Sequence, residues 1–165
     1  MEIQSSGVRV TRATLAPLWS SIVHVIRNAV DHGIETPSER LDAGKPAMGR
    51  LTLRTSFEGD DFVFSVDDDG RGIDWEEIRS CAAEKGLRST TAADLSEALF
   101  ARDFTTRKVA TEVSGRGVGL NAVRVTCEGI GGRVGLTSEK GRSTHLEIRV
   151  PGTLVRGPIA RRLSA

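Results

Sequence analysis

The stretch Phe62 to Gly72, FVFSVDDDGRG, says most about the fold of this chain. Its first half alternates the apolar Phe62, Phe64 and Val66 with other residues, which is the period of a strand that buries one face. The strand runs directly into a turn that is both acidic and rich in glycine. The segment therefore predicts a sheet that carries a buried carboxylate at the end of one strand, beside a close backbone turn.

Alternating segments elsewhere in the chain extend this sheet. Residues 51–57 precede it with the same period, and Glu58-Gly59-Asp60 supplies the turn of an antiparallel hairpin. Two further strands are expected over residues 134–136 and 146–150, before Pro151 ends the compact part. These connections favour a mostly antiparallel mixed sheet with one face in contact with solvent.

Helices account for most of the remaining pattern. The longest is expected over residues 15–31, with Val30 among the apolar residues on one wide arc and with His24, Arg27 and Asn28 on the opposite arc. Shorter helices are expected over residues 37–44, 75–85, 91–100 and 119–128. The sequence therefore predicts a two-layer α/β sandwich with its helices on one face of the sheet.

The bulk properties describe an ordinary globular domain. The chain has 165 residues, of which 38% are hydrophobic and 27% charged, and a net charge of +1, too small to attract nucleic acid or a membrane surface. No apolar run approaches the length of a membrane span. Cys81 and Cys127 lack metal-ligand or disulfide spacing, which is typical of the cytoplasm. We expect an N-terminal extension at 1–14, one domain at 15–151 and a basic tail at 152–165.

A second glycine-rich segment, Gly115-Arg116-Gly117-Val118-Gly119, opens a predicted helix. Bare backbone N–H groups at such a helix start attract anions such as phosphate. The segment fits neither the phosphate loop that ends in Gly-Lys-Ser/Thr nor the dinucleotide fingerprint. Each glycine motif alone is more often a plain turn. The chain contains, in this order, a polar helix, a carboxylate turn, an irregular stretch and a phosphate turn. This order favours an ATP site that binds adenine and phosphates with separate loops.

Three segments carry a family resemblance. Residues 24–35, HVIRNAVDHGIE, resemble the N box of chemotaxis-type histidine kinases of the CheA class, and residues 66–74 and 112–120 resemble their two glycine boxes. Residues 40–46 look like the insert that follows the N box in that family. The resemblance covers residues 15–151. It implies the ATP-binding catalytic domain with the Bergerat α/β sandwich fold, which histidine kinases share with type II topoisomerases and MutL.

The resemblance also implies roles for individual residues. Asp68 would accept a hydrogen bond from the adenine 6-amino group, Asn28 would hold Mg²⁺ with phosphate oxygens, and Thr144 would close the adenine pocket, often through water. His24, which shares a helical face with Asn28, is linked to activation of the phosphoacceptor or the γ-phosphate. The other residues that the resemblance places around ATP and Mg²⁺ are Arg27, Asp31, His32, Gly70, Gly72, Ile73, Lys108, Ser114, Gly115, Arg116, Gly117, Val118, Gly119 and Leu120.

The chain departs from the family pattern in three places. The lid, about residues 101–114, usually carries Phe-x-Pro-Gly-Phe-Ser-Thr, whereas residues 100–106 here read FARDFTT. Because Arg102-Asp103 replaces Pro-Gly, a turn built on glycine dihedrals is altered, which bears on lid closure and transfer more than on binding. Ser143 replaces the usual glycine before Thr144. A short basic tail stands where chemotaxis kinases continue into a receptor-coupling domain.

The function implied is transfer of the γ-phosphate of Mg-ATP to a histidine on a separate phosphoacceptor domain and, through that domain, to a response regulator. The sequence shows no dimerisation helices with heptads, and no nucleic acid or membrane partner is expected. The alternatives are a nucleotide-binding regulatory module without transfer, an ATPase of the topoisomerase or MutL class, and a serine kinase on the same fold. The ATPase class is disfavoured because its members usually carry a glutamate where this chain has His24.

Overall fold

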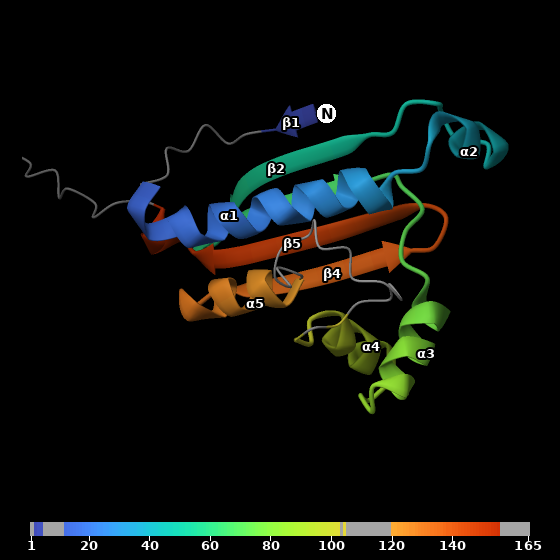
Figure 1. Cartoon of the computed structure of the whole chain (residues 1–165). Helices are drawn as coiled ribbons and strands as arrows, with labels where there is room; N and C mark the ends of the chain where they lie inside the picture. Colours follow the sequence, from blue (N-terminus) through green and yellow to red (C-terminus); the bar gives the residue numbers. More distant parts are fainter. Residues whose placement is uncertain (1, 5–11, 103, 105–119, 156–165) are drawn as a thin grey trace, which may run out of the picture.

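The computed structural model describes residues 2–4, 12–102, 104 and 120–155. Five strands form one mixed sheet in the order β1-β2-β3-β5-β4 (Figure 1). They are β1 (Glu2–Gln4), β2 (Leu51–Glu58), β3 (Asp61–Asp68), β4 (Arg133–Glu139) and β5 (Ser143–Pro151). The pairs β2–β3, β3–β5 and β4–β5 are antiparallel, as the sequence predicts. β1 pairs with β2 in parallel, and the sequence pattern gave no indication of this edge strand.

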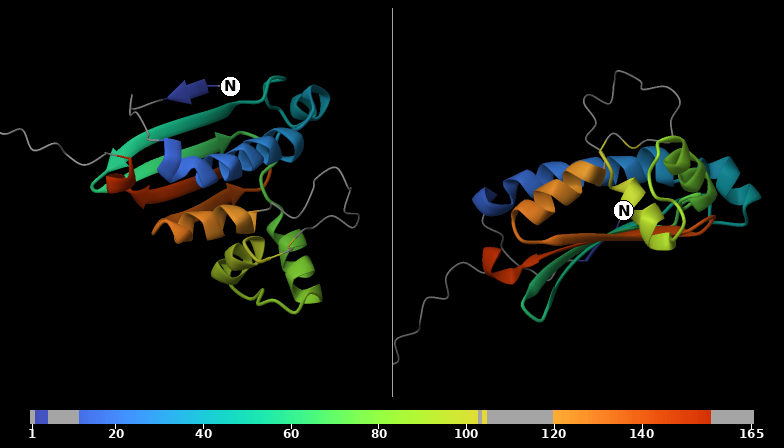
Figure 2. Two further views of the ribbon diagram at one scale, coloured as in Figure 1. Left: turned by 60° about the vertical axis from the view of Figure 1, so that its left-hand side comes forward. Right: turned by 90° about the horizontal axis from the view of Figure 1, so that it is seen from below.

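The described helices lie on one face of the sheet, and none of them covers the other face, here called the bare face (Figure 2). α1 (Arg12–Asn28) lies lengthwise along the strands, and α5 (Leu120–Gly129) packs beside it (Figure 1). α2 (Pro37–Asp42) lies next to the end of α1, while α3 (Trp75–Glu84) and α4 (Ala92–Leu99) pack on each other beyond β4 (Figure 1). This arrangement is the predicted two-layer α/β sandwich.

The hydrophobic core lies between the sheet and α1 and α5. Phe62, Phe64 and Val66 of β3 are buried there, and the Trp19 ring of α1 meets the Phe64 ring edge-on with centroids 6.1 Å apart. The core also contains Leu15, Leu18, Ile22, Val25, Leu51, Val123, Cys127, Leu146, Ile148 and Val150. Each such side chain stabilises the fold by about 1.5–3 kcal/mol when it is fully buried. The apolar residues that alternate in the sequence of β3 therefore pack in the core, as predicted.

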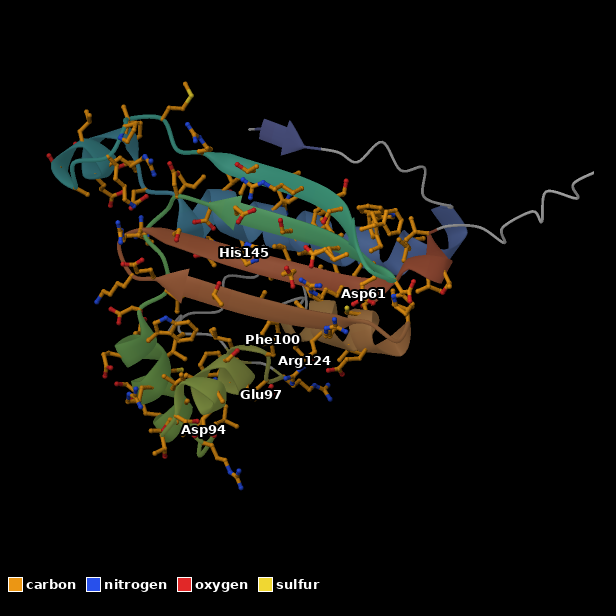
Figure 3. The ribbon with its side chains drawn as sticks, turned by 180° about the vertical axis from the view of Figure 1, so that it is seen from behind. Asp61, Asp94, Glu97, Phe100, Arg124 and His145 are labelled. Atoms are coloured by element: carbon orange, nitrogen blue, oxygen red, sulfur yellow. The ribbon has the colours of Figure 1, made fainter. Side chains whose placement is uncertain are left out.

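The bare face of the sheet carries paired charges. Asp67 of β3 accepts from the Arg54 guanidinium at 2.8 Å and lies 2.7 Å from His145 Nδ1 of β5. Asp61 binds the Arg133 guanidinium at 2.7 Å in the same way (Figure 3 labels Asp61 and His145 on this face). His145 is therefore on the side of the sheet that is opposite to the helices.

The end of α1 differs from the predicted continuous helix. Residues Ala29–Gly33 form a π-helical turn, η1, closed by a 2.9 Å bond from the Ile34 N–H to the Ala29 carbonyl oxygen. The wider turn rotates the following residues away from the core arc, so Ala29 is buried whereas Val30 is 51% exposed. The prediction that Val30 belongs to the apolar arc is wrong for this reason.

The other helices begin where the sequence placed them. Thr36 and Glu39 form the expected capping box of α2, since the Thr36 N–H donates to Glu39 Oε2 at 2.8 Å and the Glu39 N–H donates to Thr36 Oγ1 at 3.4 Å. Asp74 caps α3. After β5, a 3-10 turn, η2 (Gly152–Leu154), leads to Val155, which is 2% exposed. Packing therefore continues beyond Pro151, which was predicted to end the compact part.

Candidate nucleotide site

Three polar side chains lie in a row across the end of the sheet. Asp68 is the last residue of β3 and pairs with Thr144 of β5, which pairs on its other side with Ser138 of β4. Because alternate residues of a strand share a face, all three side chains lie on the helix-covered face, in line with Val66 of the core. The row places one carboxylate and two hydroxyl groups at the margin of the core.

The Asp68 carboxylate is buried, with 7% of the residue exposed. Burial raises the pKa of Asp68 above its ordinary value, and the charges of Asp69 and Glu35 raise it further, while backbone N–H groups of Gly70 and Thr144 act against the rise. The Gly70 N–H donates to Asp68 Oδ1 at 3.0 Å. A carboxylate has about four acceptor positions, so this hydrogen bond leaves room for a donor from a ligand.

The glycines of the turn allow three backbone segments to meet around this carboxylate. A Cβ at Gly70 would overlap the Gly33 carbonyl oxygen and lie 2.8 Å from Asp68 Oδ1. Gly72 has a φ of +63°, and a Cβ there would overlap the Glu139 carbonyl oxygen. A Cβ on Gly33 would make only ordinary contact with this carboxylate, 3.5 Å from Asp68 Oδ2. These glycines bring the end of the N box against the Asp68 turn.

The insert after the N box holds this turn from one side through Arg40. Its guanidinium is completely buried and donates to the Glu35 carboxylate at 3.1 Å, to the Asp69 carboxylate at 2.9 Å and to the Asp69 carbonyl oxygen at 3.1 Å. Its Nε donates to the Pro46 carbonyl oxygen at 2.7 Å. Burial alone would raise the pKa of Glu35, but the hydrogen bond and charge of Lys45, with the charge of Arg40, lower it overall.

The β4–β5 hairpin holds the turn from the other side. Ser138 Oγ accepts from the Ile73 N–H at 2.9 Å, donates to the Ser143 carbonyl oxygen at 2.7 Å and lies 3.2 Å from Thr144 Oγ1. The Trp75 indole N–H donates to the Ser138 carbonyl oxygen at 3.1 Å. Residues 68–75 are therefore held between the insert and this hairpin, with Thr144 at the junction.

The polar side of the N box lies along α1 and η1. His24 is half-buried, and Asn28, one helical turn later, is exposed, as are Arg27, Asp31 and His32. Within residues 2–4, 12–102, 104 and 120–155, no three acidic, histidine or cysteine side chains are grouped so that they could hold a metal ion. The exposed amide oxygen of Asn28 is a hard donor that suits a Mg²⁺ ion held mostly by phosphate oxygens.

Most residues that were expected to bind phosphate belong to the segment between α4 and α5. Lys108, Ser114 and the segment Gly115-Arg116-Gly117-Val118-Gly119 lie outside the described residues, as does most of the predicted lid at 101–114. Leu120, the last expected contact, is the first residue of α5 and is packed against the core. The structure thus brings together the adenine-side residues and the N box, and the phosphate turn stays a prediction.

The residue before the predicted lid is fixed to α5. Phe100, which follows α4, is buried, and its carbonyl oxygen accepts from the Asn121 side chain at 2.8 Å. The Arg124 guanidinium lies over the Phe100 ring, 5.5 Å from its centroid, and binds Glu97 of α4 at 2.6 Å. Figure 3 shows Glu97, Phe100 and Arg124 together at this contact. The chain therefore leaves α4 from a defined point on the helix layer.

Three residues that hold the turn after Asp68 were not predicted from the sequence. Arg40 and Lys45 were noted only as part of a family-like insert, because charges on a short exposed helix usually contact solvent. Ser138 was not singled out, although Ser138 lies two positions after Leu136 in an alternating strand and so shares its face. The pairing of Ser138 with Thr144 across the hairpin would have indicated it.

None of the helices in the described part of the chain has the length and the apolar character that a bilayer span requires.

Comparison with known proteins shows the family of the chain. Residues 19–154 match the family described as histidine kinase-, DNA gyrase B-, and HSP90-like ATPases. The chain is 40% identical over 158 residues to a gliding motility regulatory protein of Myxococcus xanthus, covering 92% of the chain and 20% of that protein. It is 39% identical over 156 residues to the chemotaxis protein CheA of Treponema pallidum, covering 92% of the chain and 19% of that protein.

Solved structures agree on the fold. A blue-light activated histidine kinase of Erythrobacter litoralis superposes with a TM-score of 0.54 at 21% identity, over 92% of this chain and 35% of that one. The catalytic domain of the histidine kinase ThkA gives a TM-score of 0.51 at 16% identity, over 91% of this chain and 76% of that one. The chain spans only about a fifth of the two curated relatives. It belongs to the family of histidine kinase-, DNA gyrase B- and HSP90-like ATPases and is homologous to the CheA chemotaxis histidine kinases.

Proposed function

We propose that this chain is the ATP-binding catalytic domain of a chemotaxis-type histidine kinase, which transfers the γ-phosphate of Mg-ATP to a histidine on a separate phosphoacceptor domain. That domain would pass the phosphate to a response regulator. The observation that carries the proposal is the buried Asp68 carboxylate at the end of β3, beside a turn in which Gly70 packs directly on the Gly33 carbonyl oxygen. A flat base can approach such a turn, and an acceptor at its end suits an amino group.

Asp68 would select adenine by the direction of one hydrogen bond. Adenine offers an amino donor at its 6-position, whereas guanine offers a carbonyl oxygen, which a buried carboxylate repels. Leaving the buried acceptor without a donor costs roughly 1–3 kcal/mol, so ATP is expected to bind at least about tenfold more tightly than GTP. Thr144, beside Asp68 in the sheet register, supports the proposal as a second polar contact at the base.

Asn28 and His24 are the proposed residues at the reacting end. When bound, Mg²⁺ would neutralise charge on the phosphates during transfer. Asn28 would contribute an amide oxygen to hold it. His24, one helical turn earlier in α1, would orient or deprotonate the incoming imidazole, because residues four apart on a helix share a face.

The arrangement of the histidines supports a separate acceptor. His145 lies in β5 on the bare face of the sheet, beside Asp67 and across the sheet from Thr144. His24 and His32 belong to α1 and η1, and α1 also carries the proposed Mg²⁺ ligand Asn28. A histidine on another domain can approach the γ-phosphate in line, whereas these three are fixed within the fold.

The transfer reaction tests the proposal directly. The purified chain is incubated with ATP labelled at the γ-phosphate, with and without a panel of helical-bundle domains that expose a histidine. The expected result is acid-labile label on a bundle domain and none on the chain itself. His24→Gln should keep the ATP affinity and lower transfer by about 10²–10⁴-fold, the usual contribution of a general base.

The same experiment decides between transfer and regulatory nucleotide binding. Arg102 and Asp103 in place of the family's Pro-Gly are the observation that favours the second function. Tight ATP binding without label on any acceptor would support that regulatory module. Label on the chain itself would contradict the separate acceptor.

A further inference from the structure

The turn that follows Asp68 has a hydrogen-bond partner for every backbone polar group of residues 69–71. In chain order, the three N–H groups donate to the Arg50 carbonyl oxygen (3.2 Å), Asp68 Oδ1 (3.0 Å) and the Gly33 carbonyl oxygen (2.8 Å). The three carbonyl oxygens accept from Lys45 Nζ (3.1 Å), Lys45 Nζ again (2.7 Å) and the Gly141 N–H (2.6 Å). The turn is therefore held in one conformation without a ligand.

Among the described residues, Lys45 is the one side chain that binds both the Asp69 and the Gly70 carbonyl oxygens, which lie on either side of the Gly70 N–H. Its ammonium group has three donors. They are directed at the carbonyl oxygens of Asp69 and Gly70 and at Glu35 Oε1, the last at 2.7 Å. The side chain is only 15% exposed. Glu35 and the buried Arg40 fix the ammonium in turn, because Glu35 is bound by both cations.

We infer that Lys45 is a positioning residue for base recognition: it holds the Gly70 peptide so that its N–H fixes the Asp68 carboxylate in the orientation that accepts from adenine. The inference rests on the proposed function, since it concerns the same site. Lys45 itself does not need to contact the nucleotide. Its effect passes through Gly70 to Asp68 Oδ1, over the 3.0 Å bond between them.

Without Lys45, the Gly70 carbonyl oxygen loses its donor and the Asp69 carbonyl oxygen keeps only that of Arg40, at 3.1 Å. The flexible glycine can then rotate its peptide planes more freely. The Asp68 carboxylate then loses a fixed orientation, and binding must supply the ordering that the free protein no longer has. The loss of binding free energy therefore concerns recognition of the base and not of the phosphates. Discrimination between ATP and GTP should therefore decrease, while the affinity for inorganic tripolyphosphate stays unchanged.

The test compares Lys45→Met with Arg54→Met by calorimetric titration of ATP, GTP and tripolyphosphate. Arg54 is a suitable control because its guanidinium also binds a carboxylate, that of Asp67 at 2.8 Å, on the bare face of the sheet. For Lys45→Met we expect about tenfold weaker ATP binding, a smaller ATP-to-GTP affinity ratio and unchanged tripolyphosphate binding. Transfer at saturating ATP should keep its kcat while the KM for ATP rises. Arg54→Met should match the wild type in all of these.

Hydrogen exchange provides a readout that does not need the nucleotide. In Lys45→Met, the amides of residues 69–71 should lose protection while those in the centre of β3 keep theirs. If Lys45→Met does not fold, Lys45→Ala replaces it, because it also removes the donors and puts no apolar chain beside Glu35. An unchanged ATP-to-GTP ratio in a folded Lys45 variant would overturn the inference. A wild-type chain without preference for ATP would instead contradict the proposed function, so the two failures are distinguishable.

Discussion

Replacing Gly72 by alanine tests how tightly the Asp68 turn is packed against the β4–β5 hairpin. Gly72 has a φ of +63°, and an added Cβ would lie 2.8 Å from the Glu139 carbonyl carbon and overlap its oxygen. Gly59, in the β2–β3 hairpin, is a matched control. It has a φ of +60°, yet nothing lies within 4 Å of an added Cβ. The pair differs in the clash and shares the backbone conformation.

The two costs can be estimated separately. A left-handed conformation costs a residue with a Cβ about 1–2 kcal/mol, which applies to both variants. Insertion of an atom into a packed contact costs about 1–3 kcal/mol more, which applies to Gly72→Ala alone. The free energy of unfolding should therefore fall by about 2–5 kcal/mol for Gly72→Ala and about 1–2 kcal/mol for Gly59→Ala.

Urea denaturation monitored by circular dichroism measures both values under the same conditions. Titration with ATP then shows whether the clash reaches the site. Gly72→Ala should weaken ATP binding because relief of the clash moves the turn away from Ser138 and Thr144. Gly59→Ala should bind as the wild type does. Equal destabilisation by the two substitutions, or ATP binding that is equal in both, would refute the packing argument.

Three further predictions concern charge and metal. Burial raises the pKa of Asp68, so the folded chain loses stability as the pH rises from the unfolded pKa of 3.8 through the folded pKa. Above that range Asp68→Asn should make the nucleotide-free chain more stable than the wild type, as measured by urea denaturation at a series of pH values. The pKa of Glu35 is lowered, so its effect on stability is the opposite. The ionised carboxylate stabilises the fold above the unfolded pKa of 4.5, and this stabilisation is lost as the pH falls through the folded pKa. The difference in free energy of unfolding between the wild type and Glu35→Gln should therefore shrink in acid. Asn28→Ala should abolish the Mg²⁺ dependence of ATP binding and change the free energy of unfolding by no more than about 0.5 kcal/mol, since the residue is exposed; Mg²⁺-dependent binding that persists would show that Asn28 merely contacts solvent.

The strands and most helices could be predicted because their signals are local. Alternation in residues 51–57 and 62–66 marks the side chains that face the helices, although Val63 and Ser65 on the other face of β3 are buried as well. Capping at Thr36 and Asp74 depends on neighbours within three residues. The end of α1 could not be predicted in this way. The π turn at Ala29–Gly33 depends on where Gly33 must meet Gly70, which is a tertiary contact.

The same distinction applies to the candidate site. Asp68 and its glycines were identified because they are adjacent in sequence. The buried Arg40 was not, because its partners include Asp69, and that contact joins segments 29 residues apart. β1 also escaped prediction, since three residues in parallel pairing have too little pattern of their own.

The central claim is that the buried Asp68 carboxylate selects adenine, and calorimetric titration with ATP and GTP tests it most directly. The wild-type chain should bind ATP at least about tenfold more tightly than GTP, the cost of one unpaired buried acceptor. Asp68→Asn should weaken ATP binding by a similar factor, because an amide can turn its own donor toward the adenine amino group. Equal affinity for ATP and GTP, or unchanged ATP binding in Asp68→Asn, would contradict the account.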